Sequence, residues 1–306
     1  MAALRSAFSQ LRDILSLAHL ITESNIKAFV TPTVLCGMMA VGSGGVTTDS
    51  PTWLEVAAAF PKVTLYIWLW DLWFDCSNQK DPGSIEEDRV NKPWRAIPSG
   101  RLSVEGAQRW YVVSACIMPA VAALLGGLPE AIAFMLETCA YDRLGGGSTW
   151  WGRSIINPLF FSTGQLGATR VVAVATSTTV SKAGYEWCIL HALLILTTIH
   201  TQDFRDFEGD KARGRNTLPL AMGEGLTRVV MSSFIVFWSF ACPAYWECSV
   251  VGYLLTGLIG ITTAARFMFC TKDRKADRVS FNFYSMLWLP AIYATPMFSQ
   301  AVASAM

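Results

Sequence analysis

The sequence predicts an all-α integral membrane protein, a bundle of about nine transmembrane helices around a central cavity. Three observations predict this class. Of the 306 residues, 52% are hydrophobic and 15% are charged, whereas soluble domains carry about a quarter charged residues. The mean hydropathy is +0.37. Apolar runs also recur along the whole chain, close to the length of about 20 residues that a helix needs to cross a bilayer.

The apolar runs define nine candidate transmembrane helices. They cover residues 24–43, 53–75, 103–125, 127–142, 155–176, 185–205, 227–246, 248–269 and 281–303. Several contain a charged residue or a proline, and a bundle accommodates these where they face its interior. We therefore expect one transmembrane domain over residues 1–306, whose residues 1–23 form an N-terminal cytoplasmic segment.

The basic residues indicate the orientation of this bundle. With the N-terminus inside, eighteen lysines and arginines fall on the inner side, and only Lys182 falls on the outer side. Cytoplasmic loops carry such an excess of basic residues. An odd number of helices then places the C-terminal segment outside, and that segment has no basic residue. We expect a multi-pass protein whose N-terminus is cytosolic and uncleaved.

Composition excludes several other classes of protein. The net charge of +1 offers no nucleic-acid surface. The eight cysteines form no CxxC pair, and the three histidines are too scattered for a zinc site. We expect neither a nucleic-acid partner nor a protein partner.

Two acidic clusters lie at the ends of the second and sixth apolar stretches. In the first, Asp71, Asp75 and Asn78 are spaced i, i+4 and i+7. On a helix, this spacing places all three on one face. The second cluster repeats the pattern with a different spacing. Its aspartates Asp203, Asp206 and Asp210 stand at i, i+3 and i+7, again on one face.

Acidic side chains at a membrane are costly unless they are paired or hydrated. Two facing acidic stripes would repel each other, and divalent cations remove that repulsion. Mg²⁺ is commonly bound by one or two carboxylates together with substrate phosphates. The stripes therefore predict a pair of Mg²⁺ sites that hold a diphosphate.

Basic residues follow each acidic cluster. Lys92, Arg95 and Arg101 follow the first, and Lys211 and Arg215 follow the second. Arginine and lysine bind phosphate oxygens and stabilise a departing diphosphate. The adjacent positions favour a phosphate-binding role over that of a solvated surface turn.

The two motifs together resemble the UbiA-type intramembrane prenyltransferase superfamily. The first reads Asp71-x-x-x-Asp75 and is followed by Asp88-Arg-Val-Asn-Lys-Pro-Trp-Arg-Ala-Ile-Pro-Ser-Gly. The second reads Asp203-Phe-Arg-Asp206-Phe-Glu-Gly-Asp210, then Lys-Ala-Arg-Gly-Arg-Asn-Thr-Leu-Pro. The likeness covers essentially the whole chain. The stretch Asn-Gln…Ser-Ile-x-Glu-Asp resembles a fungal branch that includes membrane-bound sesquiterpene cyclases.

The resemblance implies residue roles, an active site formed by loops 76–101 and 203–226, and Mg²⁺ as cofactor. The metal ligands would come from Asp71, Asp75, Asn78, Asp88, Asp203, Asp206 and Asp210. An insertion after Asp75 leaves open whether Asn78, Asp81 or Asp88 completes the first metal site. The catalytic residues would be Asp75, Asp203, Arg95 and Lys211. The substrate-binding residues would be Lys92, Arg95, Arg101, Asn78, Tyr141, Arg143 and Arg215.

The motifs predict ionisation of an isoprenoid diphosphate, and aromatic rings would then stabilise the resulting allylic cation. Candidates for those rings are Trp70, Trp73, Phe74, Phe160 and Phe161. In a terpene cyclase the prenyl chain attacks its own cation; in a prenyltransferase an external acceptor attacks it. We favour a cyclase of secondary metabolism acting on farnesyl diphosphate in the endoplasmic reticulum membrane. A prenyltransferase remains the alternative, and a non-catalytic transporter or scaffold is the third reading.

Overall fold

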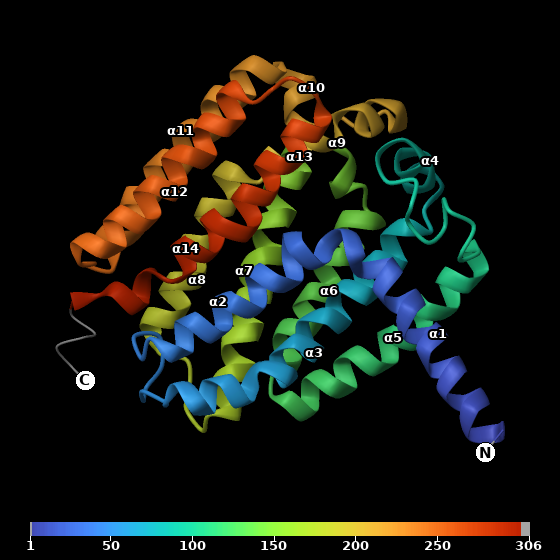
Figure 1. Cartoon of the computed structure of the whole chain (residues 1–306), viewed down its shortest axis with the longest axis horizontal. Helices are drawn as coiled ribbons and strands as arrows, with labels where there is room; N and C mark the ends of the chain where they lie inside the picture. Colours follow the sequence, from blue (N-terminus) through green and yellow to red (C-terminus); the bar gives the residue numbers. More distant parts are fainter. Residues whose placement is uncertain (1, 301–306) are drawn as a thin grey trace.

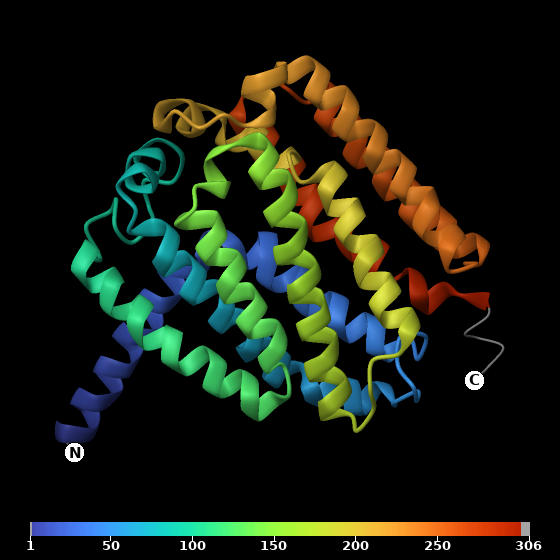
Figure 2. The same cartoon turned by 180° about the vertical axis from the view of Figure 1, so that it is seen from behind.

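The computed structural model describes residues 2–300, with side chains from residue 8 onward, and the regular elements of that part of the chain are all helices. The first half contains α1 (Ala2–Asn25), the π-helix η1 (Ile26–Val30), α2 (Thr31–Gly42), α3 (Trp53–Gln79), α4 (Pro82–Asn91), α5 (Val104–Leu125), α6 (Leu128–Asp142), η2 (Gly146–Ser148) and α7 (Trp150–Ala175). The second half contains α8 (Lys182–Thr198), α9 (Thr201–Arg213), α10 (Leu218–Met222), α11 (Glu224–Tyr245), α12 (Val250–Phe269), α13 (Arg274–Phe283), the π-helix η3 (Tyr284–Trp288), α14 (Leu289–Tyr293) and η4 (Thr295–Phe298). The long helices pack side by side in one bundle (Figures 1 and 2), which confirms the predicted all-α class.

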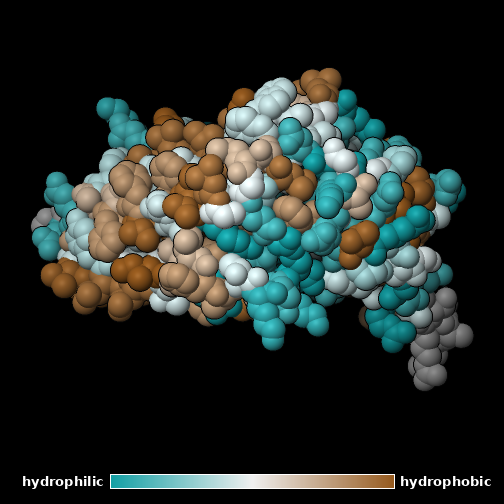
Figure 3. All heavy atoms as spheres, turned by 90° about the horizontal axis from the view of Figure 1, so that it is seen from above, coloured by the Kyte–Doolittle hydropathy of each residue, from teal (hydrophilic) through white to brown (hydrophobic). Residues whose placement is uncertain are grey.

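Four helical segments of the described chain are long and apolar enough to cross a membrane. They are Phe8–Gly42, Val104–Leu125, Glu224–Tyr245 and Val250–Phe269. Large apolar side chains on α5 and α12 point outward, with Leu124 85% exposed and Leu258 65% exposed. In Figure 3 the hydrophobic residues gather over α11 and α12, whereas hydrophilic residues dominate toward α4. An apolar surface of this extent suits lipid rather than water.

Local sequence signals set where several of these helices begin. Thr52 and Glu55 form a reciprocal capping box at the start of α3. The side chains of Ser103, Thr149 and Ser181 each accept a hydrogen bond from a backbone N–H in the first turn of α5, α7 and α8. Such caps satisfy backbone groups that a helix end leaves without partners.

The predicted sixth crossing helix, residues 185–205, is wrong as a single element. The helix breaks at Ile199 and His200, and α9 begins at Thr201. At the break, the His200 ring lies 2.7 Å from both Ser154 Oγ and Asp203 Oδ2. Asp203 therefore belongs to a separate short helix rather than to a transmembrane helix.

The predicted active-site loops 76–101 and 203–226 are largely helical. α3 continues to Gln79, and α4 starts directly afterwards because Asp81 accepts hydrogen bonds from two backbone N–H groups and Pro82 occupies the first turn. α9 and α10 occupy most of the second segment. The predicted N-terminal segment 1–23 forms most of α1, which Figure 1 shows extending away from the bundle.

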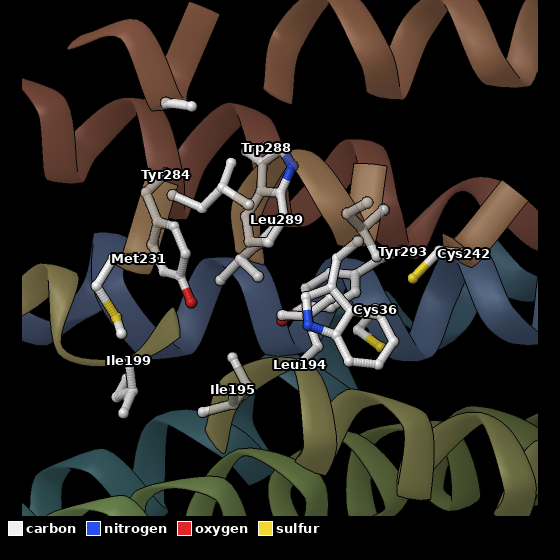
Figure 4. Close-up of a cluster of buried hydrophobic side chains, with 14 of the residues drawn as sticks. Cys36, Leu194, Ile195, Ile199, Met231, Cys242, Tyr284, Trp288, Leu289 and Tyr293 are labelled. Carbon is white, nitrogen blue, oxygen red and sulfur yellow. The ribbon is translucent and has the colours of Figure 1, made fainter. Parts of the chain in front are cut away.

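The two largest of three buried apolar clusters among the described residues hold the bundle together. One joins α2, α3, α6 and α7 around side chains such as Trp70 and Phe134. The other joins α2, α8, α11, η3 and α14, and Figure 4 shows Tyr284, Trp288 and Tyr293 at its centre. Hydrogen bonds link these rings to other helices: Trp288 donates to Ser239 Oγ at 2.8 Å, and Tyr293 Oη accepts from Gln165 at 2.8 Å. These contacts fix the helices that surround the polar end of the bundle.

Candidate active site

A cavity lies where the acid-bearing helices α3 and α9 approach each other. Residues from α1, η1, α3, α4, α6, α7, α9 and α13 line it. Its lining combines acidic, basic and aromatic side chains. The aromatic group consists of Phe29, Phe74, Phe134, Tyr141, Phe160, Phe161 and Phe281. A chamber of this composition can hold an apolar chain together with an anionic group.

The first acidic stripe faces this cavity. Asp71, Asp75 and Asn78 all line it, as their spacing on one face of a helix predicts. Asp71 and Asp75 are fully buried. Asp75 Oδ1 accepts a hydrogen bond from Asn25 Nδ2 at 3.0 Å and lies 3.6 Å from Arg95 Nη2. The stripe therefore presents buried carboxylates that only partly engage protein groups.

The acids of the second stripe do not all face the cavity, because two of them are turned toward other partners. Asp206 lines the cavity and pairs with Lys92 at 3.5 Å and with Arg205 at 3.3 Å. Asp203 lies behind the lining, since Arg153 Nη2 donates to its Oδ1 at 2.5 Å and His200 Nδ1 lies 2.7 Å from its Oδ2. In this arrangement Asp203 holds Arg153 in place.

The third acid of this stripe, Asp210, also lies behind the lining and accepts a hydrogen bond from Arg215 at 3.2 Å. Arg215 itself lines the cavity and also contacts Glu87 at 2.8 Å. These ion pairs connect the end of α9 to α4.

Three candidates were open for completing the first metal site, and only Asn78 lines the cavity. Asp88 makes a bidentate pair with Arg95, whose Nη1 lies 3.0 Å and 2.9 Å from its two carboxylate oxygens. Asp81 caps α4 and pairs with Arg213 at 3.0 Å. The insertion after Asp75 therefore supplies partners for arginines, and it adds one acid to the cavity lining, Glu87, which itself pairs with Arg213 and Arg215.

Tyr141 and Arg153 form a pair on the cavity wall. Arg153 Nη1 donates to Tyr141 Oη at 2.8 Å, and both residues line the cavity. Arg143, the base expected beside Tyr141, is exposed and does not line it. Two residues after Tyr141 at the end of α6, its side chain points away from the helix face that Tyr141 presents.

Two more predicted basic residues also fall outside the lining. Arg101 lies in the turn before α5, and Lys211 lies beside Asp210 but off the acidic stripe of α9; both are exposed. The structure thus brings Lys92, Arg95 and Arg215 to the cavity and leaves Arg101 and Lys211 at the surface.

The charges near α4 and α9 shift the ionisation of the acids outside the membrane-spanning helices. Burial would raise the pKa of Asp206, but Lys92 and Arg205 outweigh burial and hold that pKa below its usual range. Burial would also raise the pKa of Glu87, but the nearby Arg215 outweighs burial and lowers that pKa. At Asp210 burial prevails and raises the pKa to about 7.

The residues present fit a divalent cation only together with further oxygen ligands. Among the described residues, no three His, Cys, Asp or Glu side chains are grouped so as to hold a metal ion. Within the two acidic stripes, four carboxylate oxygens are nevertheless buried without a hydrogen-bond partner: Asp71 Oδ2, Asp75 Oδ2, Asp206 Oδ1 and Asp210 Oδ2. Buried oxygens of this kind are costly unless a ligand satisfies them. This pattern suits Mg²⁺, which takes few carboxylates and completes its shell with phosphate and water.

The sequence-based reasoning missed several lining residues. Asn25, Glu87, Arg153, Asn157 and Arg205 all face the cavity. Arg153 carried the clearest signal, because a charged residue just before an apolar stretch must find a partner. Asn25 and Asn157 carried none, since a single asparagine has many roles.

Among the five aromatic candidates, Phe74, Phe160 and Phe161 line the cavity, whereas Trp70 and Trp73 do not. The Phe74 and Phe160 rings are 5.4 Å apart in an edge-to-face arrangement. Trp70 packs behind them, with its ring 4.7 Å from that of Phe134. The aromatic wall is thus backed by a second layer of rings.

The sequence matches the model of the UbiA prenyltransferase family over residues 28–288. That match covers most of the chain and includes both acidic motifs, so this chain belongs to the UbiA prenyltransferase family. The resemblance to a fungal branch is matched by fungal enzymes among the proteins to which the chain is similar.

The relatives include enzymes of two kinds. The chain is 32% identical over 177 residues to the somaliensene A/B synthase of Streptomyces somaliensis, covering 58% of this chain and 57% of that protein. It is 33% identical over 181 residues to the diterpene cyclase eriG of Hericium erinaceus, covering 58% and 55%. It is also 33% identical over 151 residues to the polyprenyl transferase eriF of the same fungus, covering 49% and 51%. The chain thus spans little more than half the length of these relatives.

A solved structure shares the fold. A UbiA homologue from Archaeoglobus fulgidus, bound to DMAPP and Mg²⁺, superimposes with a TM-score of 0.60 at 15% identity. The alignment covers 94% of this chain and 99% of that one. Together with the apolar helices, this likeness confirms the predicted membrane-bundle class.

Proposed function

We propose that this chain is a Mg²⁺-dependent, membrane-bound terpene cyclase that ionises farnesyl diphosphate and cyclises it. One observation carries the proposal: acids and bases from α3, α4 and α9 line the same cavity as seven aromatic side chains. The polar group suits a diphosphate, and the aromatic group suits a polyene chain and its cation.

The basic side chains would stabilise the negative charge that develops on the leaving diphosphate. Lys92, Arg95 and Arg215 lie at the cavity, each beside a carboxylate that keeps it in place. Bound Mg²⁺ would supply Lewis-acid stabilisation of that charge, with Asp71, Asp75 and Asp206 as its protein ligands. Arg153, held by Asp203 and Tyr141, would donate to a phosphate oxygen from the opposite wall.

The reaction would follow from separating the charges. The bond between the prenyl carbon and the diphosphate oxygen breaks, and its electron pair leaves with the diphosphate. A double bond of the same chain then attacks the allylic cation, while the rings of Phe74 and Phe160 face it and exclude water. The cyclised cation loses one proton to the departing diphosphate, and the products are a cyclic hydrocarbon and protonated diphosphate.

The likeness to eriG and to somaliensene synthase supports the cyclase. The likeness to eriF favours a second candidate, a prenyltransferase that moves the same cation to an aromatic or other acceptor. The polar residues described above serve ionisation in both reactions. We further propose that the protein resides in the endoplasmic reticulum membrane with its N-terminus in the cytosol, as the basic residues suggest.

One experiment separates these candidates. Purified protein in nanodiscs receives farnesyl or geranylgeranyl diphosphate with Mg²⁺ and no acceptor, and the volatile products are analysed. A cyclic hydrocarbon that disappears on chelation of Mg²⁺ supports the cyclase. Consumption of substrate only when a phenolic acceptor is added supports the transferase. Failure to ionise either diphosphate under both conditions, in folded protein, rules out both functions.

A further inference from the structure

A second cavity adjoins the one described above. It lies between the junction of α1 with η1, the segment after α4, and the helices α9 and α13. Lys27, Trp94 and Arg278 line this second cavity and do not line the first. It therefore has walls of its own, and one of them includes a π-helix, a form that is frequent at functional sites.

The second cavity is lined mainly by basic side chains. Lys27, Lys92, Arg205 and Arg278 contribute four positive charges, against two negative charges from Glu23 and Asp206. Apart from Lys92 and Arg205, which share Asp206, these cations lack acidic partners: among the described residues, neither Lys27 nor Arg278 forms an ion pair. Convergent, unpaired cations in a concave site favour an anionic ligand.

The arginine of α13 is held so that it stays at the cavity. Arg278 Nη2 donates to the backbone oxygen of Asn91 at 3.2 Å, and its guanidinium lies 5.2 Å from the ring centroid of Trp94. Arg205 is similarly stacked 4.0 Å from the ring centroid of Phe281. A stacked guanidinium keeps further N–H donors for the oxygens of a phosphate.

The two cavities share one wall. Lys92, Arg205 and Asp206 line both of them, together with Ala28 and Phe281. Among the residues that the structure describes, Asp206 is the only acid in that shared wall, and its pairs with Lys92 and Arg205 are long, at 3.5 Å and 3.3 Å. An anion in the second cavity would thus lie against the same cations that face the first.

We infer that the second cavity is a separate binding site for a phosphate group, carried either by a phospholipid headgroup or by free inorganic diphosphate. The excess of positive charge matches a phosphate group better than a single carboxylate. The exposed Trp94 and Lys27 are residue types found at the level of lipid headgroups. The neighbouring cavity supports the other source, because it is proposed to release diphosphate.

The test compares variants at residues that belong only to the second cavity. Lys27→Ala/Arg278→Ala removes two of its cations, and Lys275→Ala is the control on an exposed position of α13 outside the cavity. Binding of inorganic diphosphate and of inorganic phosphate is measured by calorimetry on delipidated protein without Mg²⁺. We expect the double variant to bind roughly tenfold or more weakly and the control to bind as the wild type does.

A second measurement distinguishes the two sources. Protein purified from nanodiscs with and without phosphatidic acid is examined by native mass spectrometry for retained lipid. Retention by the wild type and by Lys275→Ala, but not by the double variant, identifies a lipid headgroup. Diphosphate binding that depends on the two cations, without retained lipid, identifies the free anion.

Equal binding of every probe by the wild type and the double variant overturns the inference. Should the double variant fail to fold, Lys27→Ala alone decides the question, since Lys27 is exposed and unpaired. Unchanged affinity for all probes in that variant would likewise overturn it. Because these are binding measurements without Mg²⁺, their outcome does not depend on the proposed catalytic function.

Discussion

The side chain of Asn91 bridges the backbone of α9 at two points, and Gly209 is one of them. Asn91 Nδ2 donates to the backbone oxygen of Asp206 at 2.8 Å, and the backbone N–H of Gly209 donates to Asn91 Oδ1 at 3.1 Å. A Cβ at Gly209 would lie 2.1 Å from Asn91 Nδ2. This bridge ties α4 to the helix that carries the second acidic stripe, and only glycine leaves room for it.

We expect Gly209→Ala to reduce turnover strongly. The added methyl group must displace Asn91 and shift Asp206 relative to Lys92. Misplacing a catalytic group by about 1 Å costs about a hundredfold in rate. Turnover of the prenyl diphosphate is measured beside Gly225→Ala, whose Cβ would meet nothing within 4 Å. Full activity in Gly209→Ala would show that the bridge does not position the site.

Arg153 and Arg143 provide a matched pair for the cation that accompanies Tyr141. Arg153 touches Tyr141 and lines the cavity, whereas Arg143 is exposed. We expect Arg153→Met to lower kcat by about 10²–10³-fold, the cost of removing one preorganised donor. Arg143→Met is expected to stay near the wild type in kcat and KM. A reversed order of effects would contradict the placement of Arg153 in the site.

The sequence predicted the first acidic stripe well and the second less well, for one physical reason. The spacing of Asp71, Asp75 and Asn78 fixes a helix face, and the helix continues through all three. The spacing of the second stripe also fixes a face, but not the partners of that face. Arg153 is fifty residues before Asp203 in the chain, and its engagement of that acid follows from packing alone.

The insertion after Asp75 carried a local signal that spacing arguments overlooked. Asp81 followed by Pro82 is a helix-start pattern, with a capping side chain and a proline in the first turn. Read in this way, the segment predicts α4 rather than a loop. The local sequence does not predict the pairing of Asp88 with Arg95, since Arg95 lies past the end of that helix.

α13 is fastened to α11 by a buried ion pair. Arg228 donates to both carboxylate oxygens of Asp277, at 2.8 Å and 3.0 Å, and its guanidinium lies 4.2 Å from the ring centroid of Phe204 on α9. Asp277→Asn leaves Arg228 with only the more exposed carboxylate of Glu224, 3.1 Å away, as its counter-charge, so we expect a loss of stability of about 1–3 kcal/mol. Thermal unfolding in detergent measures this loss.

The control for that variant is Glu208→Gln. Glu208 is a half-exposed partner of Arg274, and exposed ion pairs contribute about 0–1 kcal/mol. Equal melting temperatures for Asp277→Asn and Glu208→Gln would mean that the buried pair contributes nothing to the attachment of α13 to α11.

Asp75 and Asp203 serve the cavity in different ways, and their alanine variants separate those roles. Both variants are expected to lose activity by about 10²–10³-fold while remaining in membranes. Asp75 keeps a buried oxygen without a partner, so its removal relieves an unfavourable group, and the melting temperature should hold or rise. Asp203→Ala strips Arg153 and His200 of their shared acceptor, so its melting temperature should fall.

Turnover and thermal unfolding of the Asp75→Ala and Asp203→Ala variants, measured with and without Mg²⁺, check these expectations. Loss of the Mg²⁺-induced rise in melting temperature in Asp75→Ala, with substrate diphosphate present, is the signature of a metal ligand. Full turnover by either variant would refute the assignment of these carboxylates to the active site.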